Sequence, residues 1–207
     1  MNRTTRQRAC QHLRKSDPVL RAVIDAVGPF TLKFDRDRFG MLVRSIIAQQ
    51  ISGAAARTIR GRVEQLVAPE KIAPENLRRL TETQLRSAGL SSQKLSYIQD
   101  LAAKTADGVI DLRNIGRRDD EQVIAELTQV KGIGRWTAQM FMMFSLGRPD
   151  VFPEDDLGVR SAIRTLYSLP DLPDRATSRA IAEPWRPFAS VASWYCWRSL
   201  DQAKEKK

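Results

Sequence analysis

The chain contains 207 residues, of which 42% are hydrophobic and 28% are charged, and these proportions are typical of a folded globular protein rather than a disordered one. Its 34 lysines and arginines exceed its 24 acidic residues, so the formal net charge is +10, which favours a polyanionic partner. One histidine and two isolated cysteines are too few for a histidine-based catalytic triad, a clustered zinc site or an iron–sulfur cluster.

The first fifteen residues are basic, with no acidic residue among them, but no apolar segment follows them, so they do not form a secretory signal. No apolar run in the chain is long enough to cross a bilayer. The most apolar stretch, residues 140–146, is short and is expected to be a buried helix. The sequence therefore predicts a cytoplasmic protein, associated with the nucleoid if the source is bacterial, that makes no membrane contact.

Helical patterns then follow one another along the chain, most of them introduced by a residue that commonly caps helix N-termini. Residues 19–34 are compatible with a short strand pair, but no long alternating stretch exists, so the expected fold class is all-α. The predicted helices start at Asp37, at Ser52 (to Val67), at the Thr81–Gln84 capping box (to Gly89), near Ser92 (to Ala106), at Asp119 or Asp120, and after Gly134 (to Gly147), and the last two are separated by Pro184 and Pro187.

The strongest local signal is the segment LTQVKGIGRWTA at residues 127–138. Gly132 and Gly134 flank one apolar residue, Ile133, between two helical segments, which predicts a tight turn with exposed backbone N–H groups. Both glycines can take a positive φ and hold no side chain against a phosphate. The next helix directs its N-terminal N–H groups and partial positive charge to the same place. This favours a phosphate-binding hairpin; the alternative is a glycine-rich connection that binds nothing.

This segment resembles the helix-hairpin-helix motif of the base-excision DNA glycosylases. Three other segments resemble parts of that superfamily and occur in its order: SIIAQQIS at residues 45–52, PDVFPEDD at residues 149–156, and the stretch at residues 184–195 that contains PWRPF and WY. The resemblance covers about residues 38–198 and is to the 3-methyladenine DNA glycosylase II branch. The extra N-terminal β-rich domain that usually precedes this unit in that branch is not expected here.

The resemblance implies a single glycosylase unit with two helical lobes and a central DNA-binding cleft. The middle lobe would span about residues 40–135, and the two ends, about residues 1–39 and 136–207, would form the other. It also implies that the partner is double-stranded DNA containing damaged bases and that the protein is a monomer.

In the superfamily, the loop after the hairpin ends in a catalytic aspartate, which matches Asp156. A carboxylate there would stabilise the positive charge that builds on the sugar as an N-glycosidic bond breaks, and it would orient or deprotonate the attacking water. Glu154 and Asp155 compete for this role. Asp155 is otherwise expected to be the N-cap of the helix from Leu157 onward. In a purely structural role, Asp156 would favour the helix dipole and pair with Arg160.

Trp136 occupies the position at which bifunctional relatives resembling endonuclease III or 8-oxoguanine glycosylase carry a nucleophilic lysine. The resemblance therefore implies a monofunctional enzyme for alkylated purines such as 3-methyladenine and 7-methylguanine. Trp136 and Trp194 would contact the extruded cationic base; the alternative for both is core packing, which is the expected role of Trp197. Met140 and Leu157 match positions where the type II enzyme has tyrosines, so the substrate pocket is expected to be less aromatic.

The gap left by a flipped base would be filled by Gln50, with Gln49 as the alternative. Without the resemblance, polar residues at a helix end are ordinary solvated caps. The full set of residues expected to contact DNA is Gln49, Gln50, Gly132, Ile133, Gly134 and Arg135.

The resemblance further implies that the backbone carbonyls of Thr128, Val130 and Ile133 hold a Na⁺ or K⁺ ion. No redox cofactor and no catalytic metal are implied. Two other functions stay open at this point. One is a glycosylase of the same fold for deaminated or etheno bases, and the other is a non-catalytic DNA-binding module that retains only the hairpin.

Overall fold

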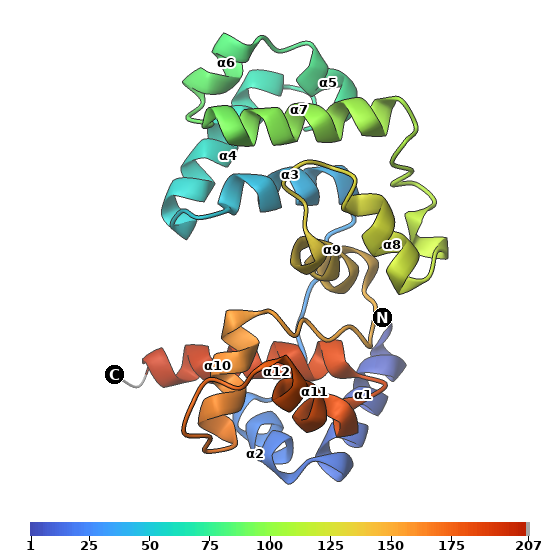
Figure 1. Cartoon of the computed structure of the whole chain (residues 1–207), viewed down its shortest axis with the longest axis vertical. Coiled ribbons are helices and arrows are strands. Elements are labelled where there is room, and N and C mark those ends of the chain that lie inside the picture. Colours follow the sequence, from blue (N-terminus) through green and yellow to red (C-terminus); the bar gives the residue numbers. More distant parts are fainter. Residues whose placement is uncertain (206–207) are drawn as a thin grey trace. The chain divides into compact units, whose positions relative to one another are not determined.

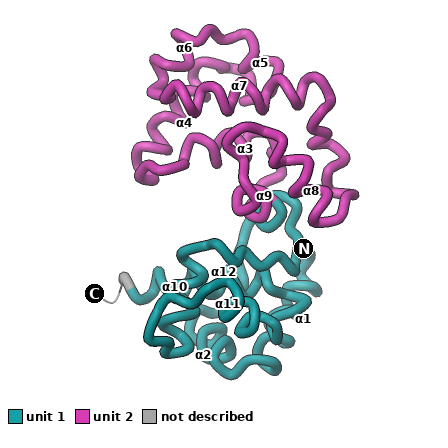
Figure 2. The backbone as a smooth tube through the Cα atoms, in the orientation of Figure 1, with its two compact units in different colours: residues 1–34, 142–207 teal, residues 35–141 magenta. Residues whose placement is uncertain are grey.

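The computed structural model describes residues 1–205, and within this range the chain is helical and contains no β-strand, which confirms the expected all-α class. No helix among these residues is long and apolar enough to span a membrane. The chain forms two compact units (Figure 2): unit 1 contains residues 1–34 and 142–207, and unit 2 contains residues 35–141. Unit 1 is thus built from both ends of the chain, whereas unit 2 is one continuous segment.

Four helices of unit 2 begin where the predicted capping residues stand. Asp37, Ser52, Thr81 and Asp119 each accept a hydrogen bond from a backbone N–H of the helix that follows, which satisfies one of the unpaired donors at a helix start. The helices in chain order are α3 (Arg38–Ala48), α4 (Gly53–Val67), α5 (Pro74–Arg78), α6 (Glu82–Ser87), α7 (Ser92–Ala106), α8 (Asp120–Leu127) and α9 (Arg135–Phe141) (Figure 1). Their apolar faces meet in a core that includes Leu42, Ile46, Val63, Ile98, Leu101, Val123 and Leu127.

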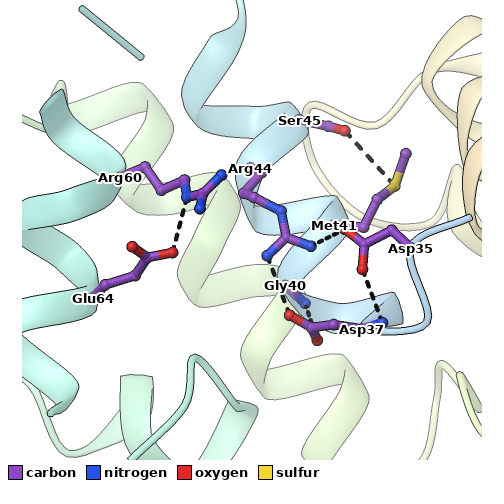
Figure 3. A network of polar contacts seen from close by, with 8 residues as sticks. All are labelled: Asp35, Asp37, Gly40, Met41, Arg44, Ser45, Arg60 and Glu64. Atoms are coloured by element: carbon purple, nitrogen blue, oxygen red, sulfur yellow. Dashed lines mark hydrogen bonds and ion pairs between the residues drawn. The ribbon is translucent and has the colours of Figure 1, made fainter. Parts of the chain in front are cut away.

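A polar network fixes the start of α3 (Figure 3). The Asp37 side chain accepts a hydrogen bond from the Gly40 backbone N–H at 3.0 Å. Arg44 pairs with Asp37 at 3.1 Å and also with Asp35. A Cβ atom at Gly40 would lie 1.9 Å from the Asp37 carboxylate, so only glycine fits beneath this cap. The network therefore sets the direction of the helix whose C-terminal end leads into the predicted wedge segment.

Unit 1 is built around its last helix. Its elements are α1 (Arg3–Ser16), α2 (Pro18–Val27), α10 (Leu157–Leu166), α11 (Arg175–Ala182), a 3₁₀ turn (Glu183–Trp185) and α12 (Ala189–Glu205). Helix α12 packs against α2 and α10. A core of fully buried side chains results from this packing, and it includes Leu13, Leu20, Ile24, Val159, Ile163, Trp185 and Tyr195.

Residues 19–34 do not form the strand pair that their pattern allowed. Asp17 instead caps α2, because its side chain accepts hydrogen bonds from the backbone N–H groups of Val19 and Leu20 at 2.8 and 3.0 Å. Pro18 occupies the first helical position, where proline has no N–H to lose and a suitable φ. Local capping chemistry thus outweighed the weak alternating pattern.

The apolar helix predicted to end near Gly147 changes its hydrogen-bond pattern on the way. It is α-helical as α9 and then π-helical over Met142–Leu146. Met140, Phe141 and Met142 are buried, as predicted for this stretch. Single π turns are uncommon in α-helices and occur often near functional sites.

Candidate functional site

The hairpin between α8 and α9 is shaped by one glycine rather than two. Gly132 has a φ of +78°, whereas Gly134 does not take a positive φ. A Cβ atom at Gly132 would lie 2.0 Å from the ring of Tyr97, while a Cβ atom at Gly134 would meet nothing within 4 Å. Ile133 is buried and anchors the turn, as predicted. Gly132 therefore makes the turn, and Gly134 leaves the backbone open to an approaching group.

Helix α7 holds the hairpin from outside. The Asp100 carboxylate accepts a hydrogen bond from the Lys131 backbone N–H at 2.8 Å and one from the Lys104 ammonium at 2.7 Å. Lys104 also donates to the carbonyl of Gln129 at 2.7 Å. Burial raises the pKa of Asp100, but the hydrogen bonds from Lys104 and Lys131 outweigh this effect and bring the pKa below its ordinary value. The charged Asp100 carboxylate, together with Lys104, thus holds the backbone of residues 129–131, which lead into the turn.

The two glutamines after α3 have different environments. Gln49 is half-buried, and its side-chain amide donates a hydrogen bond to the Gly132 carbonyl at 2.8 Å. Gln50 is exposed and has a φ of +56°, a left-handed backbone that non-glycine residues adopt infrequently. Gln49 therefore supports the hairpin from the inside, while the Gln50 side chain is presented at the surface of unit 2.

The first residues of α9 differ in their partners. Arg135 forms a bidentate ion pair with Glu121 of α8, with N–O distances of 3.0 and 2.5 Å. Trp136 is 43% exposed, an unusually high fraction for a tryptophan, whereas Met140, one turn further along α9, is buried. Of the predicted pocket residues of unit 2, Trp136 is thus presented and Met140 is packed in the interior.

The acidic loop of unit 1 contains three carboxylates in different environments. Arg179 of α11 pairs with Glu154, and its hydrogen bond lowers the pKa of that carboxyl group below the ordinary value. Arg175 of α11 holds Asp155 in a bidentate pair at 2.6 and 3.0 Å. Each of these two acids therefore has its charge balanced by an arginine of α11.

Asp156 itself is the N-cap of α10, so the expectation that Asp155 caps this helix is wrong. One oxygen, Oδ1, accepts a hydrogen bond from the Val159 backbone N–H and another from the Trp197 indole N–H, both at 2.8 Å. The residue is only 8% exposed. Two N–H donors on a single oxygen, one from the backbone and one from an indole, fix the rotation of this carboxylate.

Trp197 is the site residue that sequence reasoning missed, because core packing was expected for it. Its indole stacks on Phe144 with ring centroids 5.6 Å apart and an interplanar angle of 25°. A Cβ atom at Gly158 would lie 3.0 Å both from Asp156 Oδ1 and from the Trp197 ring. A glycine in the first turn of α10 was therefore the one local signal that a bulky partner approaches the aspartate here.

The other two predicted pocket residues of unit 1, Trp194 and Leu157, differ in exposure. Trp194 is 8% exposed and makes an edge-to-face contact with Phe30, with centroids 4.8 Å apart. Leu157, directly after the aspartate, is 65% exposed. An exposed leucine beside a buried carboxylate gives the start of α10 an apolar rim.

A search of protein-family models matches residues 43–187 to the HhH-GPD superfamily of base excision DNA repair proteins. The chain is 32% identical to DNA-3-methyladenine glycosylase 1 of Schizosaccharomyces pombe over 201 residues, which is 95% of this chain and 88% of the relative. The solved structure of S. pombe 3-methyladenine DNA glycosylase in complex with abasic DNA superposes with a TM-score of 0.84 and 31% identity, covering 94% of this chain and 97% of that chain.

The crystal structure of a DNA-3-methyladenine glycosidase from Bacillus halodurans also has a TM-score of 0.84, at 36% identity, and covers 94% of this chain and 89% of that chain. The matched segment contains the hairpin and the aspartate loop described above. The chain therefore belongs to the HhH-GPD superfamily of base excision DNA repair proteins.

Proposed function

We propose that this chain is a monofunctional DNA glycosylase that hydrolyses the N-glycosidic bond of alkylated purines, of the 3-methyladenine and 7-methylguanine type, in double-stranded DNA. The observation that carries the proposal is the setting of Asp156, a buried carboxylate held by two neutral N–H donors at a helix start. The neighbouring Glu154 and Asp155 are held by Arg179 and Arg175 of α11, whereas Asp156 is buried at the start of α10 with its Oδ1 fixed by the Val159 N–H and the Trp197 indole. The names of the relatives support the substrate class.

The proposed reaction needs one well-placed carboxylate. As the bond between the sugar C1′ and the purine nitrogen breaks, its electron pair leaves with the base, and positive charge builds on the sugar ring. Asp156 stabilises that charge electrostatically and orients the water, whose oxygen bonds to C1′ while its proton passes to the carboxylate. Alkylation at N3 or N7 makes the purine cationic, so the base departs neutral and needs no strong general acid.

The absence of lyase activity is part of the proposal. Covalent cleavage would need an amine nucleophile that forms a Schiff base with the sugar. Trp136 stands at the start of α9 where such a lysine is found in bifunctional relatives. Its exposed indole is suited instead to stacking on an extruded base, and an electron-rich ring attracts a cationic base more than a neutral one. Trp194, Met140 and Leu157 stay predicted base-contacting residues, and of these three Leu157 is the exposed one.

DNA binding is assigned to the hairpin and to the segment after α3. The open backbone at Gly134 and the N-terminal N–H groups of α9 would receive a phosphate, with Ile133 and Gly132 holding the turn and Arg135 adding positive charge. Gln50 is proposed as the wedge that fills the stack after base flipping, because it is exposed while Gln49 is bonded to the hairpin. Gln can also hydrogen-bond the orphaned partner base.

We propose that the hairpin carbonyls of Thr128, Val130 and Ile133 hold a monovalent cation. The Val130 carbonyl accepts a hydrogen bond from the Ile133 N–H at 3.1 Å, and a carbonyl oxygen has a second lone pair for another partner. A Na⁺ or K⁺ ion held by these three oxygens would supply positive charge toward a phosphate. We propose no further cofactor, a monomeric state, and action in the cytoplasm or, in a bacterium, at the nucleoid.

The deciding experiment is single-turnover release of 3-methyladenine and 7-methylguanine from methylated DNA by the wild type, Asp156→Asn and Asp155→Asn. Asparagine caps helices as well as aspartate does, so Asp156→Asn should remain folded and bind DNA. Its rate should nevertheless fall by about 10²–10³-fold or more, the loss typical of removing one transition-state-stabilising group. Asp155→Asn should stay close to the wild type.

Full activity in Asp156→Asn would move catalysis to Asp155 or Glu154. No release by the wild type would exclude alkylpurine excision. Duplexes with deaminated or etheno bases would then be the next substrates, and failure on all of them would leave a DNA-binding module.

A further inference from the structure

A large groove lies within unit 1, on the side formed by α1 and α2. It has a volume of about 1150 Å³ and is lined by α1, α2, residues 28–30 and Tyr195 of α12. All of these elements belong to unit 1, and none of the residues assigned to catalysis, base contact or the hairpin lines the groove. The groove is therefore a feature that the proposed glycosylase chemistry does not use.

The lining of the groove is strongly basic. Helix α1 contains no acidic residue, and its Arg3, Gln7, Cys10, Gln11 and Arg14 all line the groove. These positions follow the helical repeat, so they form one continuous stripe along α1. Lys15, Arg6 and Arg21 add further positive charge to the same lining.

The only carboxylate in the lining is neutralised locally. Asp25 of α2 accepts two hydrogen bonds from Arg14, at 3.0 and 2.7 Å. Arg21 donates to the backbone carbonyl of Arg14 at 2.7 Å. These contacts hold the two helices' arginines in place across the groove, so its positive charge is positioned before any ligand arrives.

The floor of the groove is formed by buried core residues. Ile24, Phe30 and Tyr195 are buried in the core of unit 1. Arg6 donates to the Leu32 carbonyl at 3.0 Å, and its guanidinium lies 5.6 Å from the centre of the Phe30 ring. The two aromatic rings in the floor therefore leave little ring surface for stacking with a ligand. This favours a ligand that is recognised by its negative charge.

We propose that this groove is a second, sequence-independent binding site for the phosphate backbone of duplex DNA. Arg3 and Lys15 are separated by about 18 Å along the axis of α1, which is the axial length of about five successive phosphates on one strand. The groove also exceeds the roughly 300–1,000 Å³ of ordinary small-molecule pockets. Cationic and amide side chains are the usual donors to phosphate oxygens. The proposal rests on the proposed function in one respect, namely that the substrate is duplex DNA.

The test compares two charge-matched double variants of the full chain. Arg3→Gln/Lys15→Gln removes two groove cations, and Arg8→Gln/Arg164→Gln removes two exposed cations of unit 1 that do not line the groove. The affinity for an undamaged 30-bp duplex is measured at several KCl concentrations. Losing two phosphate contacts should flatten the slope of log K against log [KCl] by about 1.8 in the groove variant, while the control should stay close to the wild type.

Equal slopes for the two double variants would overturn the proposal. A second probe, a labelled decaglutamate peptide, separates DNA from an acidic protein as the occupant. Binding of the peptide that is lost only in the groove variant, together with an unchanged DNA slope, would replace DNA by an acidic partner. Base release by the wild type is recorded in parallel. Without base release, a slope difference would support the groove while rejecting the proposed function.

Discussion

The hairpin of unit 2 and the aspartate loop of unit 1 solve opposite problems at the start of a helix. At the hairpin, the backbone N–H groups are the groups proposed to bind a ligand. Gly134 has no side chain to cover them, and the side chains of Asp100 and Gln49 hold the turn by hydrogen bonds to its backbone. At the aspartate loop one side chain is the useful group. The Asp156 carboxylate is oriented by hydrogen bonds from the Val159 backbone N–H and the Trp197 indole.

This difference indicates where each region is vulnerable. Substitutions at the hairpin act through shape and backbone geometry and should change stability and DNA affinity. Substitutions around Asp156 act through hydrogen bonds to one oxygen and should change the rate of the chemical step. Hairpin variants that change only the chemical rate, or variants around Asp156 that change only stability or DNA affinity, would contradict this comparison.

The largest effect on folding is expected for Gly132→Ala. A positive φ costs a non-glycine residue about 1–3 kcal/mol, and the added methyl group would also collide with the Tyr97 ring. We expect a clear drop in the melting temperature and weaker DNA binding.

Gly134→Ala is the matched variant, because nothing lies within 4 Å of its methyl group. The melting temperature should therefore stay the same, while DNA affinity falls about tenfold through loss of a charge-assisted contact. Thermal unfolding and fluorescence anisotropy measure both, and an unstable Gly134→Ala would contradict this view of the turn.

At the aspartate loop, Trp197→Phe should lower the single-turnover rate by about 10- to 100-fold, because a hydrogen bond to a charged group contributes about 1.5–3 kcal/mol. Affinity for DNA should not change. Phe144→Leu removes the stacking partner of the indole and retains the indole N–H, so it serves as the control for packing. If both variants lose the same rate and the same melting temperature, Trp197 acts only as a packing residue and the positioning role is rejected.

A smaller effect is expected for Asp100→Asn, about 1–2 kcal/mol from the weakened bonds to Lys104 and the Lys131 N–H. Because the pKa of Asp100 is lowered in the folded state, its stabilising contribution is present above the unfolded pKa of about 3.9. It is lost as the pH falls through the lower folded value. Denaturant unfolding between pH 2 and pH 6 should show a smaller acid-induced loss of stability in the variant. If the free energy of unfolding fell equally with pH in the variant and the wild type, the Asp100 carboxylate would not stabilise the hairpin through its charge.

The smallest effect concerns the exposed pair between Arg135 and Glu121. Glu121→Gln should change stability by less than about 0.5 kcal/mol, as is usual for surface ion pairs, and it should strengthen DNA binding by about two- to threefold because one repulsive charge beside the hairpin is removed. The gain should disappear at high salt. A loss of affinity would show that Glu121 is needed to orient Arg135.

Much of the helical framework could be predicted because capping is local. A capping side chain bonds to a backbone N–H only three residues further on, so a short stretch of sequence is enough to recognise it. The structure confirms the four predicted caps, Asp37, Ser52, Thr81 and Asp119. Helix α1 was harder to predict, since its buried side chains are only Ala9 and Leu13 and the basic residues dominate its pattern. Periodicity is a weak guide when one narrow face is buried.

The site was predictable where the motif is contiguous and not where it depends on the fold. Residues of the hairpin lie side by side in the sequence. The contact between Asp156 and Trp197 joins positions 41 residues apart, and Gly158 is the one local sign of it. Gln49 likewise depends on the fold, since its bond to Gly132 spans 83 residues and capping rules would describe it as a solvated helix end.

The division of the chain into units has a consequence for its synthesis. Unit 2 is continuous over residues 35–141, but α1 and α2 share their core with α10 and α12. During translation at about 5–20 residues per second, unit 2 can fold as soon as it leaves the ribosome. The first two helices must wait, with Leu20 and Ile24 uncovered, until residues beyond 189 emerge. The order of synthesis therefore makes the N-terminal helices the part of the nascent chain most in need of protection by chaperones.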